Sequence, residues 1–423
     1  MAEAPRVVEI CAGAGGQALG LELAGFDHAL AVELDSTAAA TLKANRPEWD
    51  VRVGDVADRN VWDPADFSKD GPRGPVDLLA GGVPCPPFSV AGKQLGASDE
   101  RDLFAWAIEQ VEVMRPRAIL LENVKGLSQS KFAAYRQHVL ERLWDFGYDA
   151  EWELINAADF GVAQLRPRFV LVAMEPEDFR HFHWPELSVA PVTVGEALGD
   201  LMSASGWEGA ETWIKGAGGV GPTIVGGSKR HGGADLGPTR AKQAWARLGV
   251  DGRGIADAAP LPGDSFAVGP RLTLDMVKRL QGWVGEEYSW SFEGRKTSIY
   301  RQIGNAFPPP VARAIGSAII SAFQRVGPPR AASSARKDAD AIVRVLRSEK
   351  GFVEARRLAR LANFSGSDSQ FDARLAAVSQ SFALDSKAVS GKQYYRIGEF
   401  KAFLGQADHR RHALFEVGRS KVS

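Results

Sequence analysis

The chain has 423 residues, 45% of them hydrophobic and 24% charged, and a formal net charge of −1. This composition is typical of a soluble globular protein of two or three domains. Its two cysteines, Cys11 and Cys85, exclude a disulfide scaffold and favour a reducing cytoplasm. Because no apolar run is long enough to span a bilayer, and residues 1–6 lack signal-peptide character, we expect no membrane contact.

The first 180 residues alternate short β-branched runs with amphipathic stretches. Predicted helices end at Leu23 and cover residues 102–114 and 131–146, and predicted strands cover 7–10, 29–32, 51–53, 77–80, 118–121 and 169–173. Alternation of this kind predicts an α/β fold with a doubly wound, mostly parallel sheet. Ligands of such sheets bind beyond the carboxyl ends of the strands, so polar residues at those ends are the candidates for chemistry.

The middle of the chain has a different character. Residues 181–270 lose most helical periodicity and are rich in glycine and basic residues, which predicts a small irregular domain. Regular structure returns at 271–327, where Thr273 is a candidate cap for a helix that ends at Gln281. We expect residues 1–180 and 271–327 to form one domain around this insertion.

The last part of the chain is predicted to be a separate module. After a linker at 328–338, residues 339–423 predict three short helices and a hairpin, which are the elements of a winged helix. Residues 331–423 carry 17 Lys and Arg against 10 Asp and Glu, whereas the remainder carries 34 against 42. A basic module on an acidic body suggests a local nucleic-acid contact. The helix expected to enter a groove offers only Arg374, so a packing or protein-contact module is an equal alternative.

Three successive strand ends carry residues suited to a nucleoside cofactor. The first strand is followed by a glycine-rich turn that opens a helix, Cys11-Ala12-Gly13-Ala14-Gly15-Gly16, where a ligand can approach the backbone closely. Glu33 ends the second strand, where a carboxylate can accept from ribose hydroxyls, and Asp55 ends the third, beside the expected adenine. A helix cap or a surface charge would explain each acid alone, but not the ordered series.

The fourth strand leads into a loop that holds a single thiol, Gly81-Gly82-Val83-Pro84-Cys85-Pro86-Pro87-Phe88-Ser89. Prolines on both sides of Cys85 remove backbone freedom and amide donors, so the thiol is held rigidly. This setting suits a nucleophile better than a disulfide or a metal ligand. A buried structural thiol is the plain alternative for the loop taken by itself.

These motifs resemble the cytosine-5 DNA methyltransferase family over about residues 7–322, since they are followed in order by Glu122-Asn123-Val124, Gln164-Leu165-Arg166-Pro167-Arg168 and Gly304-Asn305. The resemblance implies a Rossmann-like methyltransferase domain, with residues 181–270 as its target-recognition domain. It also implies transfer of a methyl group from S-adenosylmethionine to carbon 5 of a flipped-out cytosine in a specific sequence of duplex DNA.

The family's chemistry gives each motif a role. Cys85 would add as a thiolate to carbon 6 of the cytosine, which makes carbon 5 nucleophilic. Glu122 would contact ring nitrogen 3 and the exocyclic amine, and Arg168 would hold the carbonyl oxygen at carbon 2. Arg166 would lie near the same base, and Asn123 would steady the cysteine loop.

The resemblance also implies two sets of binding residues. The cofactor set comprises Cys11, Ala12, Gly13, Gly15, Gly16, Glu33, Leu34, Asp55, Val56, Pro84, Asn305 and Ala306. The DNA set comprises Ser89, Lys93, Arg101, Gln164, Lys229, Arg230 and Arg240. The family further implies a monomer without a metal, acting on DNA in the bacterial cytoplasm at the nucleoid, with a cognate restriction endonuclease as a candidate partner.

Three alternatives stay open on the sequence alone. A tRNA cytosine-5 methyltransferase shares the architecture, although the long basic insertion favours duplex DNA. A non-catalytic DNA-binding regulator would have no need of an intact Cys85, Glu122 and Arg168. A nicotinamide oxidoreductase would explain the glycine-rich turn and Glu33, but not the Pro-Cys-Pro loop.

Overall fold

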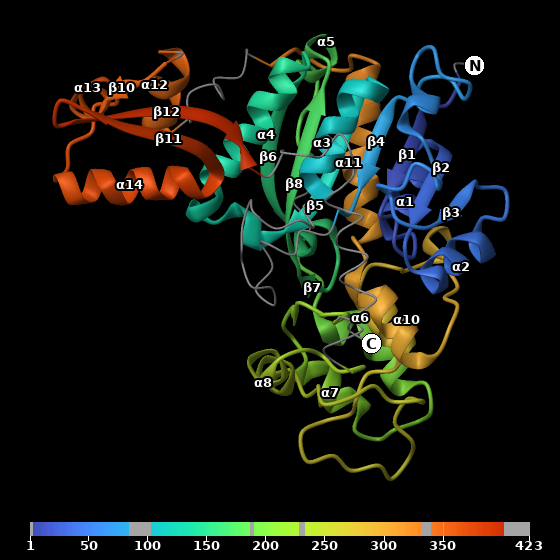
Figure 1. Cartoon of the computed structure of the whole chain (residues 1–423). Coiled ribbons are helices and arrows are strands. Elements are labelled where there is room, and N and C mark those ends of the chain that lie inside the picture. The colour runs from blue at the N-terminus through green and yellow to red at the C-terminus, as the bar shows by residue number, and fades with distance from the viewer. Residues whose placement is uncertain are drawn as a thin grey trace.

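The computed structural model describes residues 3–83, 103–186, 190–227, 233–330, 340–349 and 351–401. Figure 1 shows a central sheet covered by helices, a smaller lobe below it, and a module of helices and strands at one side. Within these residues, no helix is long and apolar enough to cross a membrane.

Seven strands form the central sheet in the order β3-β2-β1-β4-β5-β8-β6. Their bounds are β1 Arg6–Ile10, β2 Asp27–Glu33, β3 Val51–Val53, β4 Leu78–Gly81, β5 Ala118–Val124, β6 Asp149–Asn156 and β8 Pro167–Met174. Neighbours from β3 to β5 are parallel, whereas β8 runs antiparallel to both β5 and β6. The predicted doubly wound, mostly parallel sheet is confirmed, and β6 is a strand that the sequence analysis missed.

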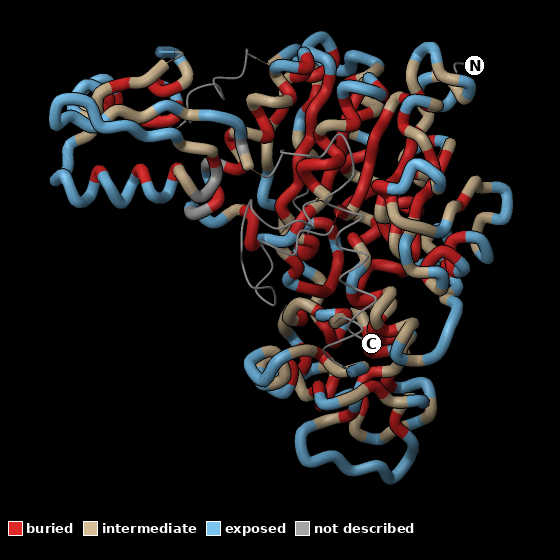
Figure 2. The backbone as a smooth tube through the Cα atoms, in the orientation of Figure 1, coloured by how far each residue is buried: buried red, intermediate tan, exposed pale blue. Residues whose placement is uncertain are grey.

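Both faces of the sheet are covered because its strands are aliphatic on both sides, as parallel strands must be. Val8 of β1 packs in one cluster with helices α3 (Leu103–Met114) and α4 (Ala133–Asp145). Val7, its neighbour, packs in another with α1 (Gly16–Ala24) and α11 (Pro309–Phe323). Figure 2 shows this buried core running through the sheet. The remaining elements of this body are α2 Ser36–Asn45, α5 Pro176–Phe179, η1 Pro64–Phe67, η4 Lys125–Ser128, η5 Ser130–Phe132 and η6 Ala157–Phe160.

The smaller lobe contains short helices that the sequence analysis did not place. Its elements are α6 Val194–Ser203, α7 Ala210–Gly216, α8 Thr239–Arg247, α9 Leu274–Leu280, η7 Glu286–Tyr288, α10 Lys296–Asn305 and a small sheet of β7 Gln164–Leu165 with β9 Gly221–Pro222. Three of these helices fall inside 181–270, and the other described residues of that segment are mostly turns and loops, in agreement with the expected small irregular domain. These helices have only seven to ten residues, so each gives two or three turns of pattern, which is why they were missed.

The packing of the small lobe continues beyond residue 270. Its hydrophobic cluster joins Trp213 and Trp245 to Met276 of α9 and Ile303 of α10. The helices α9 and α10 therefore pack with the insertion as well as with the sheet domain. The predicted cap is confirmed, since the Thr273 hydroxyl accepts from the amide of Met276 at 3.3 Å.

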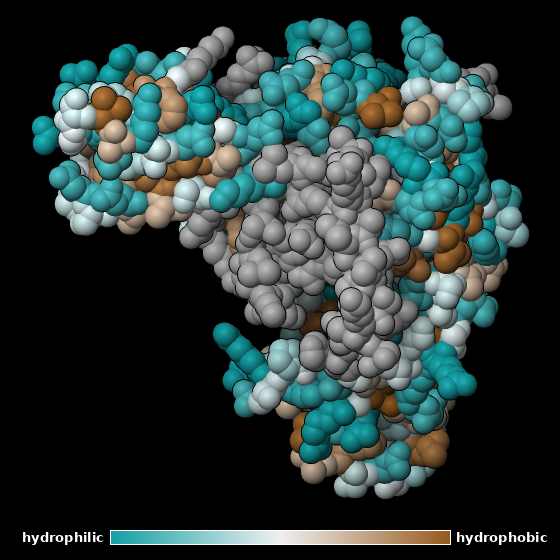
Figure 3. Space-filling view, in the orientation of Figure 1, coloured by the Kyte–Doolittle hydropathy of each residue, from teal (hydrophilic) through white to brown (hydrophobic). Residues whose placement is uncertain are grey.

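The side module contains α12 Ala341–Ser348, β10 Val353–Glu354, α13 Ala355–Leu361, α14 Asp368–Ser381, β11 Phe382–Val389 and β12 Lys392–Phe400. Its sheet has the order β10-β12-β11. The three helices and the hairpin are confirmed, and the winged-helix assignment stays a prediction. Figure 3 shows mostly hydrophilic side chains over the module.

The module is anchored on α4 by a small polar cluster. The Arg347 guanidinium pairs with the Glu141 carboxylate, and its Nη2 donates to Nδ1 of His138 at 2.9 Å. The His138 ring also packs edge-on against Phe382, with centroids 5.7 Å apart. Burial, then the charges of Arg347 and Arg142, lower the pKa of His138 from 6.5 to about 3. The anchor is therefore built around a neutral imidazole.

Candidate active site

The candidate site lies at the carboxyl ends of the parallel strands, where the sequence analysis places it. The turn after β1 is shaped to leave its backbone open. Cys11 has φ 51°, Gly13 φ 57° and Gly15 φ 94°, all in the left-handed region. Gly15 is the N-cap of α1 and has no side chain with which to cap the first-turn amides. A Cβ added at Gly13 would meet nothing within 4 Å, so space is open beside the turn.

Two carboxylates flank this turn. Oε2 of Glu33 accepts from the Gly13 amide at 2.8 Å, and Oε1 accepts from the Asp35 amide at 2.7 Å. Burial is the main cause that raises the pKa of Glu33. Oδ1 of Asp55 accepts from the Ala57 amide at 2.9 Å, which fixes the turn after β3. The structure therefore brings the predicted acids together at neighbouring strand ends.

Apolar and thiol side chains complete this part of the site. Leu34 is 50% exposed beside Glu33, whereas Val56 is buried. Burial raises the pKa of the Cys11 thiol well above its usual value, and the nearby carboxylates of Glu33 and Asp55 raise it further. Cys11 is thus held as a neutral thiol, which is a poor nucleophile.

An ion pair joins the two residues predicted to bind the target base. Arg168 Nε lies 2.5 Å from Glu122 Oε1, and each side chain is 12% exposed. They meet because β8 is antiparallel to β5 and pairs Arg168 with Val124. Burial lowers the pKa of Arg168, and the Glu122 carboxylate opposes this. The antiparallel strand thus brings a cation to the edge where the parallel strands end.

The Glu122 carboxylate also lies against the backbone that leads to the cysteine loop. Its Oε2 is 3.5 Å from the position of a Cβ at Gly82. Asn123 is buried, and its Nδ2 donates to the carbonyl oxygen of Val83 at 3.3 Å. Pro84 and Cys85 lie outside the described residues, as do Ser89, Lys93, Arg101, Lys229 and Arg230.

Gln164 is placed differently from the prediction, and its assignment to the DNA set is corrected. The side chain is fully buried. Its Nε2 donates to the Leu280 carbonyl at 3.0 Å, and its Oε1 accepts from the Ile224 amide at 2.8 Å. Both ends of the amide are used inside the protein, so Gln164 joins the sheet domain to the small lobe.

Arg166 likewise has a scaffold role. Its side chain is 1% exposed. Its guanidinium donates to the carbonyl oxygens of Ile224 at 2.9 Å, Gly304 at 2.8 Å and Ala306 at 2.9 Å. Burial is the main cause that lowers the pKa of Arg166. Its Nε has no hydrogen-bond partner among the described residues, and the predicted catalytic role of Arg166 stays a prediction.

Asn305 and Ala306, which were both predicted to bind the cofactor, lie in different surroundings. Ala306 lies beside the cofactor turn, since a Cβ on Gly16 would be 2.9 Å from the Ala306 Cβ. Asn305 instead directs its Nδ2 to the carbonyl oxygen of Gly227 at 3.3 Å. The side chain of Asn305 therefore supports the glycine-rich segment of the small lobe and not the cofactor turn.

Two residues of this region were missed by the sequence analysis. Gln281 Nε2 donates to the carbonyl oxygens of Ile303 and Ala306, both at 3.0 Å. Trp290 donates from Nε1 to the backbone oxygen of Ala14 in the cofactor turn at 2.8 Å. No local sequence pattern marks either residue, because each acts on a distant segment.

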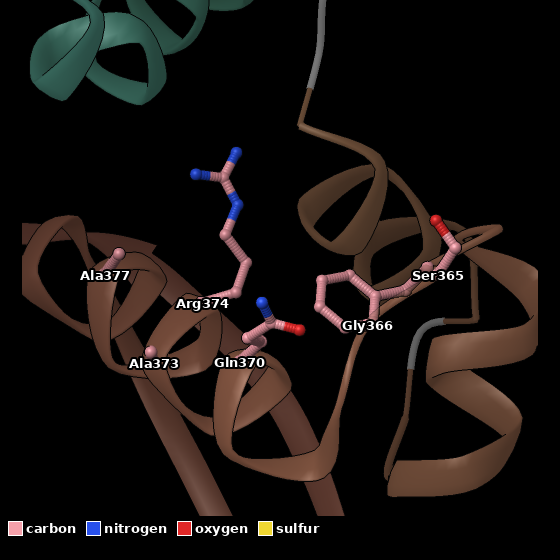
Figure 4. Close-up of a pocket in the computed structure, with 7 residues that line it drawn as sticks. Ser365, Gly366, Gln370, Ala373, Arg374 and Ala377 are labelled. Atoms are coloured by element: carbon pink, nitrogen blue, oxygen red, sulfur yellow. The ribbon is translucent and has the colours of Figure 1, made fainter.

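Two further cationic residues lie away from the strand ends. Arg240 is exposed on α8, and its predicted DNA contact stays a prediction. Figure 4 shows an open groove on the side module, lined in part by Phe364, Gln370 and Arg374. The Arg374 guanidinium pairs with the Asp340 carboxylate, so part of its charge is neutralised within the module.

Comparisons with known proteins agree with this geometry. A model of the C-5 cytosine-specific DNA methylase family matches residues 5–321. The chain is 56% identical to the type II methyltransferase M.NaeI of Lentzea aerocolonigenes, over 99% of both chains. It is 48% identical to M.NgoMIV of Neisseria gonorrhoeae, over 75% of this chain and 98% of that protein.

Solved structures show the same fold. One is a prophage-encoded protein from E. coli described as a DNA modification methyltransferase, with a TM-score of 0.51, 22% identity, and coverage of 76% of this chain and all of that one. A second is DNMT2 of Spodoptera frugiperda, with a TM-score of 0.51, 16% identity, and coverage of 75% and 100%. Taken with the matched residues and the relatives, the strand-end chemistry leads to one conclusion: the chain belongs to the C-5 cytosine-specific DNA methylase family and is a cytosine-5 DNA methyltransferase.

Proposed function

We propose that the chain transfers a methyl group from S-adenosylmethionine to carbon 5 of a flipped-out cytosine in a specific duplex DNA sequence, through a covalent bond between Cys85 and carbon 6. The observation that carries the proposal is the Glu122–Arg168 pair, which lies against the backbone leading to Cys85. The two side chains offer a carboxyl group and a guanidinium in one buried place, which matches the polar edge of a cytosine.

The cofactor turn fits S-adenosylmethionine on the features of this structure. The uncapped amides of α1 and the open space beside Gly13 suit the carboxylate of its amino-acid part. The carboxylates of Glu33 and Asp55 suit the ribose hydroxyls and the adenine amine, and the exposed Leu34 offers an apolar contact for the adenine ring. When bound, the donor supplies an electrophilic methyl group.

The chain's own residues prepare the cytosine for that methyl group. The Cys85 thiolate adds to carbon 6, and Glu122 supports a proton at ring nitrogen 3, which takes up the electron pair displaced by the addition. Carbon 5 then behaves as an enamine carbon and would form the new bond to the methyl group. The bond between that methyl group and the sulfur of the methyl donor would break at the same time and leave S-adenosylhomocysteine. Removal of the carbon-5 proton expels the thiolate and restores the ring. Arg168 holds the carbonyl oxygen at carbon 2, while its charge keeps Glu122 oriented.

The surroundings of Cys11 support the choice of Cys85 as the proposed nucleophile. Cys11 is held neutral by burial and by Glu33 and Asp55. Asn123 fixes Val83 at the start of the Pro-Cys-Pro loop, so the chain enters that loop from a rigid point. A flipped base costs a few kcal/mol to unstack, and we propose that phosphate contacts from Lys93 and Arg101 offset this cost.

A trapping experiment tests this mechanism. Duplex DNA with 5-fluorocytosine at every cytosine position is incubated with the full chain and S-adenosylmethionine, and the products are separated under denaturing conditions. Fluorine at carbon 5 cannot leave as a proton does, so we expect a stable protein–DNA adduct. Peptide mapping by mass spectrometry should place the adduct on Cys85 and not on Cys11. Absence of any adduct on DNA of diverse sequence, under conditions where the donor binds, would refute the covalent step.

The biological setting is proposed from the relatives. The two relatives named above are type II methyltransferases, so we propose that this chain protects the DNA of its host from a cognate restriction endonuclease. We also propose, from the family resemblance, that it acts as a monomer. Bisulfite sequencing of DNA from cells that express the chain would give the recognised sequence. Methyl transfer to tRNA with none to DNA would favour the tRNA alternative instead.

A further inference from the structure

The segment that connects α9 to α10 lies against the turn proposed to receive the methyl donor. We call residues 286–295 the strap, and Figure 1 shows this part of the chain beside α2. Trp290 in the strap is 2% exposed, and its Nε1 donates to the backbone oxygen of Ala14 at 2.8 Å. A Cβ on Gly15 would lie 2.5 Å from Trp290 Cζ2, so the indole also fills the space beside that glycine.

The strap is itself firmly held, which allows Trp290 to act as a fixed point. The Asn45 side chain of α2 donates to the Ser291 carbonyl at 2.7 Å and accepts from the Ser291 amide at 2.8 Å. Nζ of Lys278 in α9 donates to the Trp290 carbonyl at 2.5 Å. The Arg46 guanidinium lies 5.1 Å from the centroid of the Trp290 ring. Contacts from both α2 and α9 therefore orient the indole.

The turn has hydrogen bonds of its own, but none of them reaches the Ala14 carbonyl. The Gly13 amide donates to Glu33 at 2.8 Å, and the amides of Ala12 and Gly15 donate to the carbonyls of Val32 and Ala12 at 3.1 and 3.2 Å. Gly13 and Gly15 permit many backbone conformations, and α1 begins without a capping side chain. Ala14 is buried, so its carbonyl oxygen depends on the indole N–H for a hydrogen bond. Without the indole N–H, the turn would favour conformations in which the Ala14 carbonyl reaches water.

We propose that Trp290 is a positioning residue for the methyl donor: its indole N–H holds the Cys11–Gly16 turn in the one conformation that the donor binds. This inference rests on the proposed function, because it assumes that the turn is the donor site. The donor then binds a turn that is already formed. If the fraction of molecules with the turn in this conformation falls, the apparent affinity for the methyl donor falls by the same factor.

The test replaces Trp290→Phe in the full chain, which keeps an aromatic ring and removes the N–H. Trp283→Phe is the matched control. Trp283 is 4% exposed in the same hydrophobic cluster, and its Nε1 has no hydrogen-bond partner in the described part of the chain. We expect Trp290→Phe to raise the Kd for S-adenosylmethionine, measured by calorimetry, about tenfold over the control. The KM for the donor should rise equally, with kcat at saturation within about twofold of wild type, because the bound donor restores the turn.

A second variant loosens the strap without touching the indole. Asn45→Ala removes both bonds to Ser291 and should raise the same Kd in the same direction, by roughly threefold. Equal donor Kd values for Trp290→Phe and Trp283→Phe would overturn the inference, as would a lower kcat with an unchanged Kd. Wild-type protein that binds no S-adenosylmethionine would instead overturn the proposed function.

Discussion

Replacement of Arg166 by Met separates a scaffold role from a catalytic one. The guanidinium donates to three buried carbonyls, and the Ala306 carbonyl keeps a second donor in Gln281. The Arg166→Met variant therefore leaves the carbonyls of Ile224 and Gly304 without this partner. At about 1–3 kcal/mol for each unsatisfied buried group, the cost is about 2–6 kcal/mol. Relief from burying a charge offsets part of it, so we expect a loss of about 3 kcal/mol in the free energy of unfolding.

The assay is thermal unfolding followed by circular dichroism in the absence of donor and DNA. At about 2–4 °C for each kcal/mol, the midpoint should fall by roughly 6–12 °C. Arg240→Met is the control, since Arg240 is exposed on α8 and its replacement should change the free energy of unfolding by less than about 0.5 kcal/mol. An Arg166→Met protein with a wild-type midpoint and a hundredfold lower kcat would support the catalytic role of Arg166 and refute the scaffold role.

Three other predictions concern the nucleophile and the side module. Cys85→Ala should abolish methyl transfer and retain DNA binding in a gel-shift assay, and residual turnover near wild type would contradict its role. The folded pKa of His138 lies below its unfolded value of 6.5, so its contribution to stability is complete above that pH and is lost as the pH falls toward about 3. Between pH 7 and pH 5 the free energy of unfolding should fall by about 2 kcal/mol, and His138→Gln should remove this dependence. Deletion of residues 331–423 should leave methyl transfer intact and reduce the salt dependence of DNA binding, whereas an unchanged salt slope would argue against a DNA contact in the module.

The two relatives differ in whether they have a segment that corresponds in length to the side module. The alignment with M.NgoMIV takes in nearly all of that protein and leaves a quarter of this chain unmatched, about the length that follows the end of the family match at residue 321. The alignment with M.NaeI extends over 99% of both chains. Methyltransferase relatives thus occur with and without a counterpart of this length, which agrees with the expected survival of activity after deletion.

The sequence by itself determined the features that depend on local order. Hydrophobic period and turn residues place most strands of the sheet within a few residues of their observed bounds, because the pattern that buries a strand is written along that strand. Glu33, Asp55 and Glu122 could be assigned for the same reason: each lies within two residues of the carboxyl end of a strand, and the carboxyl ends of parallel strands meet at one edge of the sheet. The family resemblance added the chemical roles.

Only the tertiary structure decided which polar residues meet at the strand ends and which hold distant segments together. Gln164 and Arg166 stand in the same short motif as Arg168, yet they bond to backbone 58 to 140 residues away, while Arg168 meets Glu122 through the antiparallel pairing of β8. Trp290 reaches a carbonyl 276 residues distant. A buried hydrogen-bond donor needs a partner, which can come from any segment that the fold brings near it. The local sequence around the donor therefore does not predict which distant residue this partner is.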